Sequence, residues 1–187
     1  MSQSFKDINT SLKAFAKTKF SSELKIEVPE LRKKKSVPQI YRTALSKALV
    51  SGSRKVEAAL IGGLQANMAS SIWDWPGTTL RVSGQSVGSP RNIVDTGLLA
   101  SGNYVRAAYT TRGANITVGN NVPYAALVHF GGYIKPYGNP NASSVFLPPR
   151  PWLSATIGAD TSVARAVTVD WREIIRQELI DQMQSAE

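Results

Sequence analysis

The spacing of apolar residues predicts a long helix in the first half of the chain. Between residues 45 and 68 apolar side chains follow one another at helical spacing, interrupted only by Gly52. Since such spacing places side chains on one helix face, we expect a helix that starts near Pro38 and ends before Trp75-Pro76-Gly77. Serine and glycine at 51–53 lower helix propensity and predict a bend. The stripe consists of Leu45, Leu49, Val56, Leu60, Leu64 and Met68.

Two further stripes predict helices at the ends of the chain. One predicts a C-terminal helix from about Ser162 to Met183, and a shorter one predicts an amphipathic N-terminal helix that Ser4 or Asp7 caps. The stripes are Val163, Val167, Trp171, Ile175, Leu179 and Met183 at one end, and Phe5, Ile8, Leu12 and Phe15 at the other.

The middle of the chain has the pattern of strands. We expect a strand at 79–82, and a hairpin of strands 104–110 and 115–119 that turns through Arg112-Gly113-Ala114. A short helix that ends at Gly131-Gly132, a long loop over 133–144 and a strand over 144–147 follow. The predicted fold class is α+β: a small antiparallel sheet packed by the long N-terminal-half helix and the C-terminal helix, with an N-terminal helical arm.

Charge and composition divide the chain. Residues 20–37 are polar, contain Pro29 and the basic run Arg32, Lys33, Lys34 and Lys35, and predict an exposed connector. We therefore expect a basic arm and connector over 1–37 and a core domain over 38–187. Residues 1–60 carry a net charge of +8 out of +9, which favours contact with DNA or an acidic protein face, or gives a solvated surface.

Composition also limits the chemistry. The chain has no cysteine and one histidine, so disulfides are excluded and we expect no metal site or cofactor. It has no phosphate-binding glycine loop and no nucleophile elbow. No apolar run approaches the roughly 20 residues that cross a bilayer, and no signal-peptide stretch is present, which predicts a soluble protein made in a reducing cytosol.

Val94-Asp95-Thr96-Gly97 resembles the active-site loop of retroviral-type aspartic proteases. Those enzymes need two carboxylates that share a proton, and the helices and leucines that flank this loop argue against that fold. We expect Asp95 to act as an N-cap that accepts backbone N–H groups, and we expect no enzyme.

Single side chains outside that loop also have structural interpretations. His129 can sense pH or bind a metal, but helix capping or a bond to a neighbouring subunit suits a lone histidine better. Arg150, held between two prolines, suits a carboxylate partner in the core or across an interface. The four tryptophans are expected in the core rather than as platforms for single-stranded nucleic acid.

Three motifs together carry a family resemblance. They are Asp95-Thr96-Gly97-Leu98-Leu99, Tyr124 to Gly131 with His129 near its end, and Pro148-Pro149-Arg150-Pro151-Trp152-Leu153. In order and spacing they resemble tailed-bacteriophage neck and tail-completion proteins, the HK97 gene-10-like and Mu virion-morphogenesis family. Ala100 stands where that family usually has arginine, and Trp152 where it more often has phenylalanine.

The resemblance implies a virion protein, assembled in the host cytoplasm, that forms a ring of six copies at the head-tail junction. Its partners are then other copies of itself, a portal, adaptor or head-completion protein above, and a tail tube or terminator protein below. Arg112, His129, Tyr133 and Tyr137 are the expected subunit-interface residues. The Arg32–Lys35 run is expected to meet DNA in the channel or an acidic partner. A tail terminator is the second interpretation, and a basic cytosolic DNA-binding protein is the rival from another class.

Overall fold

The computed structural model describes residues 20–27, 39–81, 83–110, 113–135, 141 and 143–185. Its strands are β1 (Phe20–Glu27), β2 (Thr79–Leu80), β3 (Ser86–Val87), β4 (Asn103–Thr110), β5 (Gly113–Asn120), β6 (Gly132–Ile134) and β7 (Val145–Leu147). Its helices are α2 (Gln39–Ala69), α3 (Leu98–Ser101), α4 (Ala125–Phe130), α5 (Trp152–Thr156) and α6 (Trp171–Gln184).

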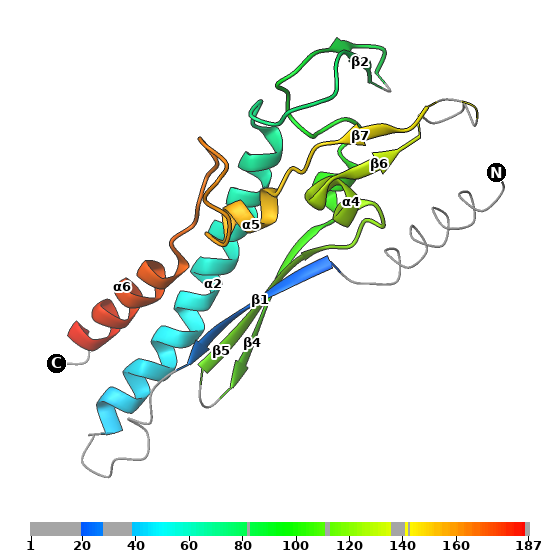
Figure 1. The fold of residues 1–187 in the computed structure, drawn as a ribbon. Coiled ribbons are helices and arrows are strands. Elements are labelled where there is room, and N and C mark those ends of the chain that lie inside the picture. Colours follow the sequence, from blue (N-terminus) through cyan, green and yellow to red (C-terminus); the bar gives the residue numbers. More distant parts are fainter. Residues whose placement is uncertain are drawn as a thin grey trace.

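The fold is α+β, as the sequence predicts. The long helix α2 lies at the centre, with α6 along one side and the three-stranded sheet along the other (Figure 1). The sheet is antiparallel in the order β1-β5-β4, and β4 and β5 form the predicted hairpin. Two small antiparallel pairs, β2-β3 and β6-β7, lie outside this sheet.

The predicted stripe of α2 forms the centre of the core. Val56, Leu60, Leu64 and Met68 are all 0% exposed, whereas Leu45 at the start of the stripe is only half-buried. The four fully buried side chains belong to one cluster with Ile116 and Val118 of β5 and Trp152 and Leu153 of α5. Because each fully buried aliphatic side chain stabilises the fold by about 1.5–3 kcal/mol, α2 holds the sheet and α5 together.

The small residues at 51–53 have a role that their helix propensity does not reveal. A Cβ atom on Gly52 would lie 2.8 Å from Cδ1 of Ile175 in α6. The glycine therefore allows α6 to approach α2 closely. Ser53, the next residue, is 0% exposed, so small residues at this point of α2 serve packing.

A buried carboxylate joins the same two helices. Glu178 of α6 is 4% exposed; it forms an ion pair with Lys55, and its Oε1 lies 2.6 Å from the hydroxyl of Ser51. These partners, Lys55 first, lower the pKa of Glu178 to about 2, although burial opposes them. The Lys55–Glu178 pair is therefore charged at neutral pH. It joins α2 to α6 near Gly52, where the two helices lie close together.

The predicted connector over 20–37 is wrong where the structure describes it. Residues 20–27 form β1, which pairs with β5 from Phe20 opposite Asn120 to Glu27 opposite Gly113. Its exposed and half-buried positions alternate from Phe20 to Lys25, as in a strand with one face on a core. The strand β1, which lies within the expected arm and connector over 1–37, therefore belongs to the same sheet as β4 and β5 of the expected core domain. The predicted N-terminal helix and the basic run at 32–35 lie outside the described residues.

The C-terminal helix starts nine residues later than predicted. Arg165 has φ +69°, and the backbone N–H of Val167 donates to Asn67 Oδ1 at 2.7 Å while its carbonyl accepts from Asn67 Nδ2 at 2.8 Å. Because the buried amide of Asn67 bonds to both backbone groups of Val167, this residue cannot use them for helical hydrogen bonds, and residues 163–165 form a turn instead. The helix begins after Asp170, whose carboxylate accepts the backbone N–H of Glu173 at 3.0 Å.

Two smaller elements differ from the sequence prediction, and the end of α2 agrees with it. The helix α5 was not predicted, and β6 lies at the start of the expected long loop, where it pairs with β7. The end of α2 comes at Ala69, before Trp75-Pro76-Gly77, and the carbonyl of Met68 accepts the backbone N–H of Ile93 at 3.1 Å. Contacts with distant segments therefore set these boundaries.

Two adjacent glycines of α2 give a matched test of these contacts. A Cβ on Gly62 meets nothing within 4 Å, whereas a Cβ on Gly63 would lie 2.9 Å from methyl groups of both Thr156 and Val169. Gly62→Ala should stabilise the protein by about 0.5–1 kcal/mol, as expected for alanine over glycine in a helix. Gly63→Ala should destabilise it by about 1–3 kcal/mol through overpacking. Urea unfolding of both variants measures the difference, and equal effects would contradict this account of the α2 contacts.

Candidate functional site

The three sequence motifs meet around one pocket. The pocket has a volume of about 240 Å³. The first motif supplies one side of its wall, and Tyr124 and Val128 of the second motif supply another. Trp75 completes the wall, and Arg150 of the third motif lies against that tryptophan. The lining residues are Trp75, Ile93, Val94, Asp95, Thr96, Gly97, Leu99, Ala100, Tyr124 and Val128.

The lining is apolar in the main and poor in reactive groups. Among the residues that line the pocket, Asp95 is the single carboxylate, and histidine, cysteine, serine and lysine do not occur. Thr96 and Tyr124 add hydroxyl groups to this wall, and burial, followed by the charge of Asp95, raises the pKa of the Tyr124 hydroxyl. The pocket is suited to hold an apolar group with a polar atom near its rim.

Asp95 does not cap α3, contrary to the sequence prediction. The residue directly before α3 is Gly97, with φ +82°, and no side chain makes a capping hydrogen bond there. Asp95 lies three residues before the first helical residue, beyond the position from which a side chain caps. The nearest contact of this kind is the N–H of Leu98 with Thr96 Oγ1 at 3.4 Å. Asp95 is instead exposed on the pocket wall.

Arg150 bonds to a carbonyl rather than to the carboxylate that we expected. Its Nε and Nη2 donate to the backbone carbonyl of Asp74 at 3.0 and 2.7 Å, and its guanidinium carbon lies 3.9 Å from the centre of the Trp75 ring. The guanidinium carbon of Arg91 lies 3.4 Å from the centre of the same ring. Burial, and then the charge of Arg91, lower the pKa of Arg150 to about 10. Two cations thus hold the indole that forms one wall of the pocket.

Pro151 and Trp152 continue this motif into the core. Pro151 precedes α5 with φ −79°, and Trp152 is 0% exposed. The prediction that the tryptophans belong to the core is confirmed: Trp73 is also buried, and Trp75 and Trp171 are partly buried against the core cluster.

The second motif forms the predicted short helix with its glycine stop. Tyr124 precedes α4, and Gly131 follows it with φ +74°. A Cβ on Gly131 would also lie 2.6 Å from the carbonyl oxygen of Leu147, so both conformation and space require glycine there. The chain can therefore turn directly from α4 into β6 beside β7.

His129 lies inside the protein, so the expected contact with a neighbouring subunit does not fit its position. The residue is 2% exposed, and Nε2 lies 2.9 Å from the hydroxyl of Ser154. Its ring lies 4.6 Å from Phe20 and 5.0 Å from Trp152, measured between ring centres. Burial lowers the pKa of His129 to about 4, against the smaller opposing effect of Asp160. The imidazole is thus neutral at physiological pH and joins α4 to α5.

Of the other expected interface residues, the structure describes Tyr133. Its side chain is 71% exposed on β6, and its ring centre lies 5.3 Å from that of Phe146 on β7, which is 51% exposed. Arg112, Tyr137 and the Arg32–Lys35 run lie outside the described residues. Sequence reasoning missed Phe146 because the pairing of β6 with β7 was not predicted.

Comparison with protein-family models, with curated proteins and with solved structures found no match for this chain. Within the described residues, no group of three or more His, Cys, Asp or Glu side chains is arranged to hold a metal ion. Over the same part of the chain, none of the helices has both the length and the apolar character needed to span a bilayer.

Replacing Arg150 with lysine should destabilise the protein. Arg150→Lys loses the two-pronged bond to the Asp74 carbonyl, which an ammonium group cannot reproduce, and we expect a loss of about 2–3 kcal/mol. Arg172→Lys is the matched control, because Arg172 also lies over a tryptophan, at 5.0 Å, but is exposed. The control should change the free energy of unfolding by less than about 0.5 kcal/mol. Chemical denaturation measures both, and equal losses would contradict the structural role of Arg150.

The single histidine gives a direct test of burial. The folded state keeps His129 neutral until the pH falls to about 4, whereas the unfolded chain takes up the proton near 6.5. Stability should therefore be complete above pH 6.5 and fall by about 3 kcal/mol as the pH drops to 4. The one imidazole signal in an NMR titration should show a midpoint near 4, and a midpoint near 6.5 would contradict the buried position. His129→Gln should remove this part of the pH dependence.

Proposed function

We propose that the chain is a structural protein of a phage virion, which forms a ring at the neck and completes the tail or joins head to tail. One observation above all supports this function. The three motifs of the family resemblance come together in space, where they build and brace one apolar pocket. Motifs that share a single site have a shared purpose, and this site suits binding rather than catalysis.

The exposed aromatic side chains support an assembly role. Tyr133 and Phe146 are exposed together on the β6–β7 hairpin, and Phe130, which is 63% exposed, ends the helix before it. Large apolar side chains that are exposed next to each other, as Tyr133 and Phe146 are, are typical of interaction surfaces in water-soluble proteins. In the proposed ring they are covered by neighbouring subunits or by the proteins above and below.

The charge distribution supports a passage for DNA or an acidic partner. Nearly all of the net charge of +9 lies in residues 1–60. In the proposed ring, which the resemblance gives six copies, these residues line the channel or contact a portal, adaptor or tail protein. Contacts of lysine and arginine with phosphate are weak individually and independent of sequence, which suits DNA that moves through a channel.

Electron microscopy of the purified full chain tests the neck function. We expect negatively stained rings of uniform size, and we expect virions assembled without this protein to give separate heads and tails. Solitary particles at every concentration, together with intact virions in its absence, would overturn the proposal. Tight binding of a single copy to duplex DNA at physiological salt would instead favour the rival, a DNA-binding protein.

A further inference from the structure

We propose that the β6–β7 hairpin of one copy inserts the side chains of Tyr133 and Phe146 into the Trp75–Leu99–Val128 pocket of the next copy. This contact rests on the proposed function, because it is the joint by which the ring closes. It assigns a donor surface and an acceptor surface to different parts of the same chain.

The donor surface is an aromatic pair that its own subunit leaves uncovered. Tyr133 lies opposite Phe146 in the antiparallel register, so both side chains lie on the same face of the ribbon. Their rings meet edge to face at 62°, a preferred aromatic geometry that presents one compact apolar surface. An isolated two-stranded ribbon is marginally stable in water, and a partner that covers this face would stabilise it.

The acceptor surface is the pocket that the first two motifs line together with Trp75, the residue against which Arg150 of the third motif lies. Ile93, Leu99 and Ala100 form its apolar wall, and Leu98 beside it is 55% exposed. No residue of β6 or β7 contributes to this wall, so the hairpin does not occupy the pocket of its own subunit. At about 240 Å³ the pocket is smaller than the roughly 300–1,000 Å³ of typical ligand sites, which suits the rings of the aromatic pair rather than a whole helix.

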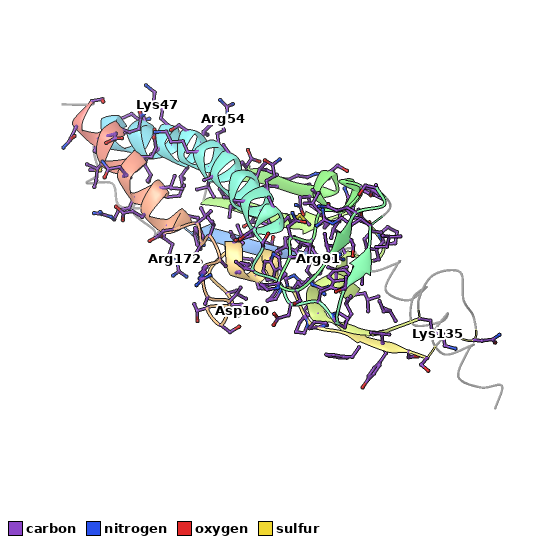
Figure 2. All side chains as sticks on the ribbon, turned by 90° about the horizontal axis from the view of Figure 1, so that it is seen from above. Lys47, Arg54, Arg91, Lys135, Asp160 and Arg172 are labelled. Carbon is purple, nitrogen blue, oxygen red and sulfur yellow. The ribbon has the colours of Figure 1, made fainter. Side chains whose placement is uncertain are left out.

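Charge fixes the direction of the contact. Asp95 is exposed on the pocket wall, and Lys135 follows directly after β6. Figure 2 shows the hairpin extending away from α2 and α6, with Lys135 towards its outer end. When the aromatic pair enters the pocket, the ammonium group of Lys135 can approach the carboxylate of Asp95. Complementary charges at the edge of an apolar contact set its register and orientation.

The two surfaces differ, so the contact is head-to-tail. Head-to-tail contacts generate a closed ring when the rotation between copies closes, and an open filament when it does not. A ring built in this way buries every hairpin and fills every pocket. It therefore accounts for both unpaired features of the single subunit.

A mixing experiment tests this contact. The donor variant is Tyr133→Ser with Phe146→Ser, and the acceptor variant is Ala100→Trp, which fills the pocket from its wall. Each variant alone should sediment as a monomer where the unaltered chain forms rings, with self-association weakened at least tenfold. An equal mixture should form a one-to-one dimer, because one intact hairpin and one intact pocket remain. Leu80→Ser is the control, since Leu80 is 73% exposed but lies outside both surfaces, and it should leave the rings unchanged.

The outcomes separate this inference from the proposed function. If the unaltered chain forms rings that both variants retain, the hairpin contact is wrong and the neck function stands. If the unaltered chain stays monomeric, the neck function itself fails. If deletion of residues 1–19 dissolves the rings and the hairpin variants do not, the N-terminal segment is the occupant and the inference is overturned. Asp95→Lys provides a second acceptor variant if Ala100→Trp fails to fold, and unchanged rings in that variant would also count against the contact.

Discussion

The structure depends on one helix being buried along most of its length on more than one side. The aliphatic stripe of α2 faces β5 and α5, while Gly52 allows α6 to lie close against another side. The ion pair of Lys55 with Glu178 and the amide of Asn67 then fix α6 and the segment before it. The helix α2 thus contacts β4, β5, α5 and α6, and also α3, whose residues line the pocket.

The sequence predicts the features that periodicity and local chemistry determine. The buried stripe of α2, the β4–β5 hairpin and the glycine stop of α4 are all confirmed, because each depends on neighbours within a few residues. The failures share a different cause. The sequence of β1 has the composition of a connector, and its pairing with β5 makes it a strand. Val163 and Val167 have helical spacing, but the backbone N–H and carbonyl of Val167 bond to Asn67, a hundred residues away in the chain.

The candidate site shows the same division. Sequence motifs identify Asp95, Tyr124, Gly131 and Arg150 as special positions, and the structure brings their segments together. It changes their roles, because Arg150 bonds to the Asp74 carbonyl and Asp95 lies on a pocket wall instead of capping a helix. No sequence pattern near Phe146 or Arg91 indicates a role for them. Phe146 meets Tyr133 because β7 pairs with β6, and Arg91 lies over the ring of Trp75.

A protein built this way carries an uncovered aromatic pair and an open apolar pocket on one small subunit, and in the ring that we propose the association of copies covers both. Native mass spectrometry of the full chain across a range of concentrations tests this most directly. We expect a single closed assembly of fixed copy number in equilibrium with monomer. A mass of one chain at all concentrations, or a ladder of lengths without a preferred number, would contradict a protein that closes on copies of itself.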